Sequence, residues 1–402
     1  MLWYVALVFA IAAVFYLAVP GMGAFIVRGQ WRLFRRTIGE ISRYPMANAR
    51  AVGRSKNVFI GYFRFFGTLE SIQGDDRIWI ANGHGSVAVD LNHLSVYMLP
   101  ASASPREGRD EADLAAVPWN RIFSLSEGTT ILVGGALFAE DGRGVFRPHG
   151  RQKPLVVIYD CKREHIVPQA VRSGRHRNEF WNLFTIPSIV TGSFTLFLLA
   201  YFFLGPLDQR IPALIALAMS LAPVAPFLPP GFPLYFLYRL YWKKARSLRA
   251  ERDLVMLPMR YFPSHGDSTG EAPRQLRATL LPDLEPYIML RGREQPGTPP
   301  SIVASGERIL IPPDTRRLEI SRGTEAESYV FGAYDEVDGS ILLRKPDDPM
   351  AELVLVPGNP EEIAAKCGSA ARTYEFVSAF FIGANVALNV TAILFLLSYI
   401  VG

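Results

Sequence analysis

Two histidines with an aspartate between them come nearest, in type and spacing, to a metal site in this chain. His84 and His93 are nine residues apart, and Asp90 lies between them. Imidazole and carboxylate groups can hold a zinc ion that activates water for hydrolysis. A fourth candidate ligand is missing from the neighbouring sequence, which favours solvated loop positions for both histidines. A membrane hydrolase that uses His84 or His93 is therefore the third of three hypotheses.

Other residue patterns that would support catalysis are absent from the sequence. Gly83-His84-Gly85 lacks the third glycine of a dinucleotide-binding motif and is typical of a hairpin turn, and no P-loop pattern occurs. Ser86 lies in Gly-His-Gly-Ser-Val rather than in the Gly-x-Ser-x-Gly of a nucleophile elbow. Cys161 and Cys367 are 206 residues apart, and neither has an activating neighbour in the sequence. We therefore assign no catalytic, cofactor-binding or metal-binding residue and expect a protein that is not an enzyme.

Four long segments carry no Asp, Glu, Lys or Arg. All 79 charged residues fall in the other 293 residues, where they make up 27%, a normal fraction for soluble domains. An uncharged apolar run of more than about 18 residues can cross the roughly 30 Å hydrocarbon layer as a helix. The sequence thus predicts a four-span membrane protein with two soluble regions and excludes a wholly soluble enzyme. The four segments are Leu2–Val27, Phe180–Leu207, Ile211–Tyr238 and Phe376–Gly402.

The basic residues flank these segments on one side only. Eight basic residues and one acid lie between positions 28 and 56, and six basic residues lie between positions 239 and 252. The loop between the second and third segments has only Asp208 and Arg210. Because cytoplasmic loops are enriched in Lys and Arg, we expect both termini to be external and both soluble regions cytoplasmic. The first segment has no basic residue before it, which favours a span over a cleaved signal peptide.

Aromatic and basic residues alternate where the first and third segments end, as in Gln30–Arg36 and Tyr235–Lys244. Such stretches suit the headgroup layer, where rings lie half in water and cations meet anionic lipid. The net charge of +5 is also compatible with nucleic-acid binding. The positions of the basic residues favour membrane lipid as the partner and no nucleic acid.

These observations give a predicted organisation in six parts, an α+β membrane protein with four transmembrane helices and two small, mainly β cytoplasmic domains of barrel or sandwich type. The parts are transmembrane helix 1 (1–27), a first interfacial helix and β domain (28–179), transmembrane helix 2 (180–207), a proline-kinked transmembrane helix 3 (208–238), a second interfacial helix and β domain (239–375), and transmembrane helix 4 (376–402).

The two soluble regions have similar local patterns at a constant offset. Gly135–Gly142 and Gly332–Gly339 both read Gly-Ala, five residues, Gly, with an aspartate just before the last glycine, at an offset of 197 residues. The second and fourth uncharged segments begin 196 residues apart, and the first and third each contain Pro-Gly, where we expect a break in the helix. A shared order of elements at one offset predicts a tandem duplication.

Short β-branched runs with Gly and Asp-Gly turns predict the strands of both β domains. Two stretches rich in Pro, Gly and charge, Ala101–Ala116 and Ser264–Pro300, are expected to be surface loops. The predicted strands are residues 76–81, 86–91, 129–133, 145–147 and 155–159 in the first domain, and residues 302–304, 309–311, 317–320, 328–331, 341–344 and 353–356 in the second.

The second domain has a Val-x-Gly strand at Val330–Gly332, an acidic turn at Asp335–Gly339, a basic-Pro strand at Arg344–Pro346 and a small helix at Glu361–Ala371 before the last span. In this order it resembles the GIDE or "beside a membrane" domain of mitochondrial membrane-anchored ubiquitin ligases and bacterial relatives. The resemblance implies a β domain held at the bilayer by flanking helices. Together with the Arg-rich, Cys-poor composition, it also implies a bacterial inner membrane. Ligase activity does not follow from it, because the RING of those ligases needs a series of Cys and His ligands and this chain has two cysteines.

The uncharged segments contain features that set helix packing. Asn385 and Asn389 lie four residues apart and therefore on one helix face, which favours hydrogen bonding between helices over a pore lining. The third segment has five prolines between positions 223 and 233, so we expect it to kink or end near Pro229.

The leading functional hypothesis is a non-enzymatic scaffold or assembly protein that binds a protein partner or a second copy of itself through its β domains. The alternative is a small-solute channel or membrane sensor lined by the third and fourth spans.

Overall fold

The computed structural model describes most of the chain. The described residues are 2–48, 58–92, 94–99, 114–122, 124–176, 179–205, 209–262, 277–297, 299–304, 306–320, 327–337 and 340–401. They divide into two compact units, a helical unit (Met1–Leu33, Asn178–Leu248 and Gly368–Gly402) and a β unit (Phe34–Arg177 and Arg249–Cys367). We call residues 34–177 the first lobe and residues 249–367 the second lobe of the β unit.

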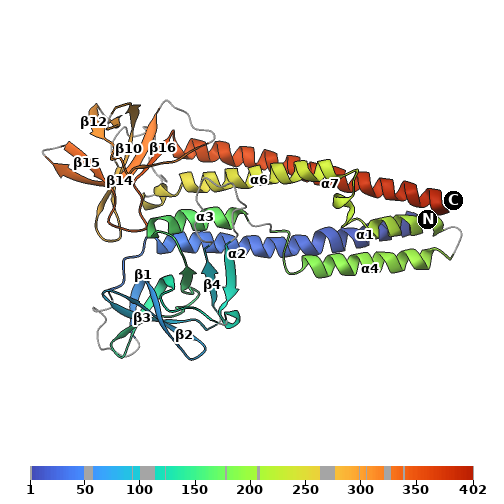
Figure 1. The fold of residues 1–402 in the computed structure, drawn as a ribbon, viewed down its shortest axis with the longest axis horizontal. Coiled ribbons are helices and arrows are strands. Elements are labelled where there is room, and N and C mark those ends of the chain that lie inside the picture. Colours follow the sequence, from blue (N-terminus) through green and yellow to red (C-terminus); the bar gives the residue numbers. More distant parts are fainter. Residues whose placement is uncertain are drawn as a thin grey trace. The chain divides into compact units, whose positions relative to one another are not determined.

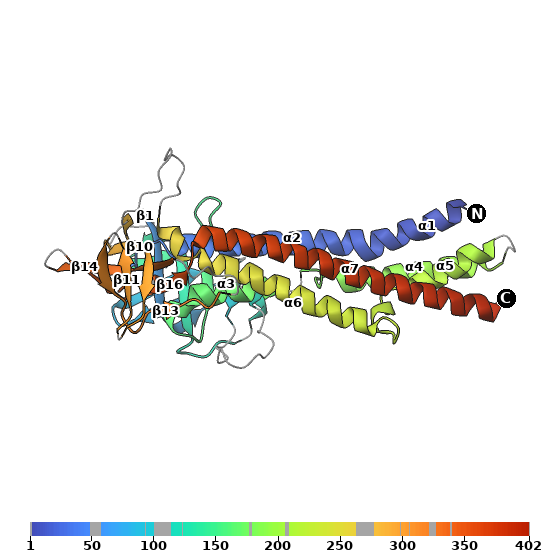
Figure 2. The same cartoon turned by 90° about the horizontal axis from the view of Figure 1, so that it is seen from above.

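Within the described part of the chain, three helices are long and apolar enough to cross a membrane, namely Leu2–Ile41, Thr185–Phe203 and Pro360–Tyr399. In the helical unit, Val8 of the first helix packs with Leu196 and Ala213 in a common apolar core. Figures 1 and 2 place both chain ends at the same end of this unit. The helices of the chain are α1 (Leu2–Ala13), α2 (Val19–Ile41), α3 (Ile166–His176), α4 (Thr185–Phe203), α5 (Arg210–Ser220), α6 (Phe232–Val255) and α7 (Pro360–Val401).

The expected break at Pro20-Gly21 is wrong. α1 and α2 are joined by a π-helical turn, Val14–Ala18, and the helix continues past Pro20 to Ile41. Pro20 lacks the N–H that would bond to the preceding turn, and the wider π turn just before it accommodates this loss without ending the helix.

The third uncharged segment is divided, as its prolines predict. α5 ends at Ser220, a 3₁₀ turn covers Ala225–Phe227, and α6 begins at Phe232. α5 lies against α4. By itself α5 is shorter than a membrane-crossing helix.

The first lobe contains a closed five-stranded barrel. β1 pairs with both β2 and β6, β6 pairs with β7, and β7 runs parallel to β3, which pairs back to β2. This is the strand order of an OB-type Greek-key barrel, a fold that does not by itself specify a ligand. The strands of the lobe are β1 (Val58–Gln73), β2 (Arg77–Asn82), β3 (Gly85–Asp90), β4 (Ser95–Met98), β5 (Ala115–Pro118), β6 (Thr130–Glu140), β7 (Arg143–Phe146) and β8 (Leu155–Ile158).

The inside of this barrel is filled by apolar side chains from its strands, among them Phe65, Ile80 and Val133. Trp119 closes one side of the core and donates its indole N–H to the carbonyl oxygen of Asp75 at 2.5 Å. β8 extends the sheet beyond β6, and β4 runs parallel to β8.

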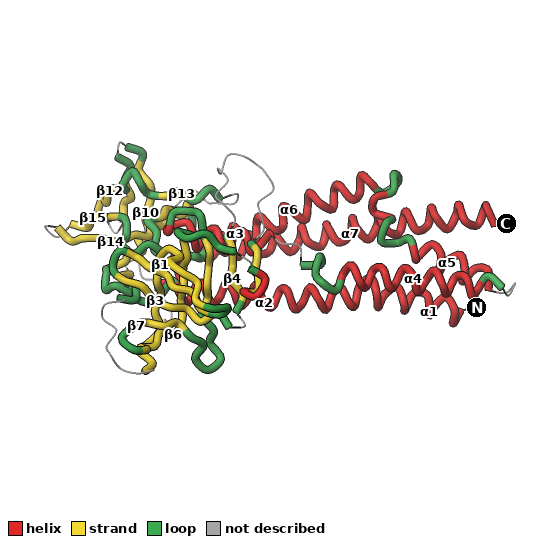
Figure 3. The backbone as a smooth tube through the Cα atoms, turned by 60° about the horizontal axis from the view of Figure 1, so that its bottom comes forward, coloured by secondary structure: helices red, strands yellow, loops and turns green. Residues whose placement is uncertain are grey.

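The second lobe repeats the order of these pairings. β10 pairs with β11 and β14, β11 with β12, and β14 with β15 and β16, while β13 runs parallel to β16 (Figures 1 and 3). β12 lies against β15, and β9 adds to the edge of β10. The strands are β9 (Arg277–Leu280), β10 (Pro286–Gln295), β11 (Ser301–Ala304), β12 (Glu307–Leu310), β13 (Arg316–Arg317), β14 (Ser328–Val337), β15 (Ser340–Arg344) and β16 (Val354–Pro357).

Two glycines have the same role in the two lobes. A Cβ on Gly67 of β1 would collide with Ile80 and the backbone of Ala81 on β2. A Cβ on Gly292 of β10 would collide with Ile302 and the backbone of Val303 on β11. In each lobe the first barrel strand therefore passes too close to the second for any side chain at this point.

Ten of the eleven predicted strands lie on observed strands, eight of them with small shifts at their ends. The predictions 129–133 and 328–331 are too short, because β6 runs from Thr130 to Glu140 and β14 from Ser328 to Val337. The prediction of residues 317–320 is largely wrong, because β13 covers only Arg316–Arg317. The loop prediction for Ser264–Pro300 is wrong from Arg277 to Gln295, where β9 and β10 form. The loop prediction for Ala101–Ala116 lies mainly outside the described residues, and its end enters β5.

Candidate functional site

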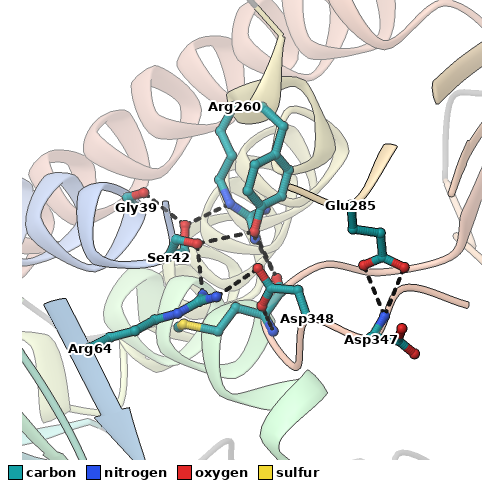
Figure 4. A network of polar contacts seen from close by, with 9 residues as sticks. Gly39, Ser42, Arg64, Arg260, Glu285, Asp347 and Asp348 are labelled. Carbon is teal, nitrogen blue, oxygen red and sulfur yellow. Dashed lines mark hydrogen bonds and ion pairs between the residues drawn. The ribbon is translucent and has the colours of Figure 1, made fainter. Parts of the chain in front are cut away.

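A buried ion pair joins the two lobes. Arg64 lies on β1 of the first lobe, and Asp348 lies on the connection between β15 and β16 of the second. Arg64 Nη2 is 2.6 Å from Asp348 Oδ2, and both side chains are 0% exposed (Figure 4). Taking two charges out of water costs several kcal/mol per ion, so such a pair persists only where further hydrogen bonds complete it.

Each side chain of the pair also forms a hydrogen bond with a backbone group. Arg64 Nη1 donates to the carbonyl oxygen of Ser42 at 2.8 Å, and Asp348 Oδ1 accepts the backbone N–H of Met350 at 2.8 Å. The chain after α2 runs alongside β1, where Arg64 exchanges backbone hydrogen bonds with Pro45 and Ala47. The guanidinium therefore has a fixed position relative to both the helix end and the barrel.

Arg260 makes a second connection across the same junction. It lies in a 3₁₀ turn of the second lobe, Pro258–Tyr261, and its Nε donates to Ser42 Oγ at 2.8 Å. Its Nη2 donates to the carbonyl oxygen of Met350 at 2.6 Å, so one guanidinium contacts both lobes (Figure 4). The ring of Tyr261 stacks on this guanidinium at 4.4 Å and is itself buried.

The connection that carries Asp348 is held within its own lobe. Glu285 accepts the backbone N–H of Asp347 at 3.0 Å (Figure 4). It also pairs with Arg344 Nη1 at 2.5 Å. Asp347 itself is exposed, whereas the next residue, Asp348, points into the junction. A fixed backbone at this point orients the Asp348 carboxylate towards Arg64.

Further ionisable groups surround the junction. Burial raises the pKa of Glu352, although Arg316, 3.1 Å away, acts against this shift. Glu164 of the first lobe forms an ion pair with Lys345 of the second, and this contact lowers the pKa of Glu164. Burial also lowers the pKa of the neighbouring His165, so that at neutral pH this imidazole is mainly uncharged.

The polar groups of the junction connect the two lobes. Both Nη atoms of Arg64, the carboxylate of Asp348 and the guanidinium of Arg260 bond to protein groups from both lobes, which fixes the lobes against each other. Arg64 Nε has no hydrogen-bond partner among the described residues. Among the described residues, no group of three or more His, Cys, Asp or Glu side chains is placed to hold a metal ion.

Of the residues singled out from the sequence, His84 and Asp90 lie at opposite ends of the β2–β3 pairing and do not form a site. His84 lies in the predicted hairpin turn between β2 and β3, exposed, with its backbone N–H on Asn82 Oδ1 at 2.9 Å. Asp90 ends β3 and accepts the N–H of Asn92, and His93 lies outside the described residues. Ser86 is a residue of strand β3 and does not lie on the strand-to-helix turn of a nucleophile elbow.

The two cysteines lie in the β unit and differ in burial. Burial, with a smaller contribution from Asp160, raises the pKa of Cys161 to about 11, so its thiol stays protonated and weakly nucleophilic at neutral pH. Cys367 is buried, with its sulfur 3.7 Å from Glu251 Oε1.

The two asparagines of α7 contact the proline-rich break between α5 and α6. Asn385 Nδ2 donates to the carbonyl oxygen of Gly231 at 2.5 Å, and Asn389 Nδ2 donates to Asn385 Oδ1 at 3.1 Å. A Cβ on Gly231 would collide with both amides. Asn385 Nδ2 also lies 3.5 Å from the carbonyl oxygen of Pro226, whose partner four residues later, Pro230, has no N–H to donate, so α7 supplies a donor from the side.

Sequence reasoning missed all three residues of the junction, Arg64, Asp348 and Arg260. One signal was present for Arg64, which stands in Phe63-Arg64-Phe65-Phe66, a charge inside an apolar strand. No known protein family, curated protein or solved structure matches the chain, so the resemblance to the GIDE domain stays a prediction.

Proposed function

We propose that this chain is a non-enzymatic scaffold of a bacterial inner membrane that presents its two β lobes as one rigid surface for a protein partner or a second copy of the chain. The buried Arg64–Asp348 pair carries this proposal. It joins positions 284 residues apart, each on a lobe with its own core. A surface that is already ordered loses less conformational entropy when a partner binds, and a fixed pair of lobes is ordered in this sense.

The matching order of strands in the two lobes supports a repeated, structural use of one module. Both lobes have the meander of three strands, the later hairpin and the parallel outer pair in the same order along the chain. Gly67 and Gly292 make the same close approach in the two barrels. We propose that the chain arose from two copies of one unit, in which a β domain lies between membrane helices.

Four membrane crossings are part of the proposal. Chain ends on the same side of a membrane require an even number of crossings, and both ends lie at the same end of the helical unit (Figure 1). The fourth crossing would be made by α5, the proline-rich break and the start of α6 together. The basic residues that follow the first and third uncharged segments then lie on the cytoplasmic side and meet anionic lipid. Nucleic acid is not part of the proposal.

The packing of Asn385 and Asn389 favours the scaffold over the channel alternative. Both side chains are buried and bond towards Gly231 or to each other, so they hold helices together instead of lining an open path.

Photo-crosslinking in cells tests this function. A photoreactive amino acid would replace Ile72 on the first lobe or Leu342 on the second, both exposed, and Phe395 on α7 would serve as the control position. We expect the same protein, or a second copy of this chain, to be captured from both lobes and not from Phe395. Capture from neither lobe would refute the scaffold, and a solute flux into liposomes that contain the purified protein would favour the channel.

A further inference from the structure

Three charged residues from separate segments meet where the uncharged segments of the helical unit end. Arg28 is the first charge after Leu2–Val27, and Glu179 is the last charge before Phe180–Leu207. Arg246 lies on α6, two turns beyond the end of Ile211–Tyr238. Because the first two positions bound membrane-length segments, the cluster marks the edge of the proposed hydrocarbon layer.

The carboxylate of Glu179 holds the cluster together. Arg28 Nε and Nη2 are both 2.8 Å from Glu179 Oε2, and Arg246 Nη1 is 3.5 Å from Glu179 Oε1. The segment that carries Glu179 is tied to the first helix by Asn182, whose Nδ2 donates to the carbonyl oxygen of Pro20 at 3.1 Å. Two guanidiniums and one carboxylate leave the cluster with a net charge of +1.

Arg246 is incompletely satisfied. Its side chain is 8% exposed and lies over the ring of Trp242 at 5.3 Å, but its Nε has no hydrogen-bond partner among the described residues. A buried N–H of a charged group without an acceptor costs free energy, and an anionic oxygen satisfies it best. Arg28, with 45% of its side chain exposed, leaves one side of the cluster open to such an acceptor.

We propose that Arg246 and Arg28 bind the phosphate of an anionic phospholipid, with Glu179 fixing the position of Arg28. A guanidinium matches phosphate oxygens in geometry, and the net charge of +1 matches the single negative charge of a phosphodiester. The phosphates of a bilayer lie at the edge of its hydrocarbon layer, and basic sites between helices on the cytoplasmic side bind acidic headgroups. The inference rests on the membrane insertion in the proposed function, but not on its protein partner.

Lipid titration of the full-length protein in detergent tests this site. Phosphatidylglycerol is compared with phosphatidylcholine of the same acyl chains, and the rise in Tm with lipid concentration gives an apparent Kd. The variants are R246Q and a matched control, R239Q, which removes the same charge from an exposed position of the same helix. We expect phosphatidylglycerol to stabilise the wild type and R239Q alike, and to bind R246Q at least about tenfold more weakly, as the loss of a hydrogen bond to a charged group implies.

Equal weakening in R246Q and R239Q would overturn the site, since a diffuse basic surface would then explain the binding. The same Tm increase with glycerol phosphate would show a site for free phosphate and not for lipid, and would overturn the lipid assignment. If R246Q fails to fold in phosphatidylcholine, R246K decides: it keeps the charge but loses the Nε donor, and an unchanged affinity for phosphatidylglycerol would overturn the proposal. Crosslinking from the lobes reports on the scaffold separately, so failure of either idea is distinguishable from failure of the other.

Discussion

The substitution Asp348→Asn tests whether the ion pair stabilises the junction of the lobes. It leaves the guanidinium of Arg64 at 0% exposure without its counter-charge, 2.6 Å from a neutral amide. Removing one partner of a buried pair costs about 3 to 5 kcal/mol of the free energy of unfolding. For a unit of this size the loss corresponds to a fall in Tm of roughly 6 to 20 °C.

The chain offers a matched control one residue away. The Asp347 side chain is 91% exposed, and its ion pair with Arg344 is long, at 3.5 Å. Asp347→Asn should therefore change the free energy of unfolding by no more than about 0.5 kcal/mol. A double variant, Arg64→Met with Asp348→Leu, replaces both charges with apolar side chains and should recover most of the lost stability. Unfolding by urea would be followed for the full-length protein in detergent by tryptophan fluorescence and circular dichroism.

Two results would refute this reasoning. If D348N and D347N unfolded at the same urea concentration, the pair would contribute nothing, and other contacts between the lobes, such as those of Arg260 with Ser42 and Met350 and of Glu164 with Lys345, would hold them together. If the double variant were no more stable than D348N, the loss of stability in D348N would come from poorer packing of the substituted side chain and not from the unpaired charge of Arg64.

Three further predictions concern other parts of the chain. Gly231→Ala should destabilise the helical unit by about 1 to 3 kcal/mol, because the new methyl group meets two buried amides, whereas Gly383→Ala, with open space around its Cβ, should be neutral or stabilise by up to about 1 kcal/mol in thermal unfolding. Burial raises the pKa of Glu352 in the folded protein above the ordinary carboxyl value of 4.5. The stability that its protonated form contributes is therefore complete below pH 4.5 and is lost as the pH rises through the folded pKa. The Tm of Glu352→Gln should rise relative to that of the wild type as the pH rises, and a constant difference in Tm would contradict this. In a Cys367→Ala background, alkylation of Cys161 by iodoacetamide should be slow at neutral pH and rise about tenfold per pH unit towards its pKa of about 11, while a plateau below pH 9 would contradict the shift.

Hairpins were predictable from the sequence because their signals are local. The Asn82–Gly85 turn lies between two alternating apolar runs, and β2 and β3 form on either side of it. The proline-rich break was predictable for a similar reason, since each proline acts on its own turn. Each of these features depends on residues within a few positions of one another.

The longest strand of the first lobe, β1, was not predicted because its environment is not local. Four consecutive residues, Arg64–Gly67, are buried, so this strand has no alternation of apolar and polar faces. One face lines the barrel core, where Phe65 packs, and Arg64 on the other turns towards the second lobe. β10 was missed because its first half is apolar and its second half reads Arg-Gly-Arg-Glu-Gln, a sequence that resembles a loop.

The partner of Arg64 lies beyond sequence reasoning for a physical reason. A charge inside an apolar strand can be recognised as needing a counter-charge, but the chain has 37 acidic residues to choose from. Asp347 and Asp348 are neighbours of the same type in one polar turn, yet one side chain is 91% exposed and the other 0%. What separates them is the backbone direction that Glu285 imposes by accepting the N–H of Asp347. Asp348 becomes the partner of Arg64 because Asp347 donates its backbone N–H to Glu285, 62 positions away in the sequence. This contact forms only when the second lobe folds, so the sequence alone does not reveal it.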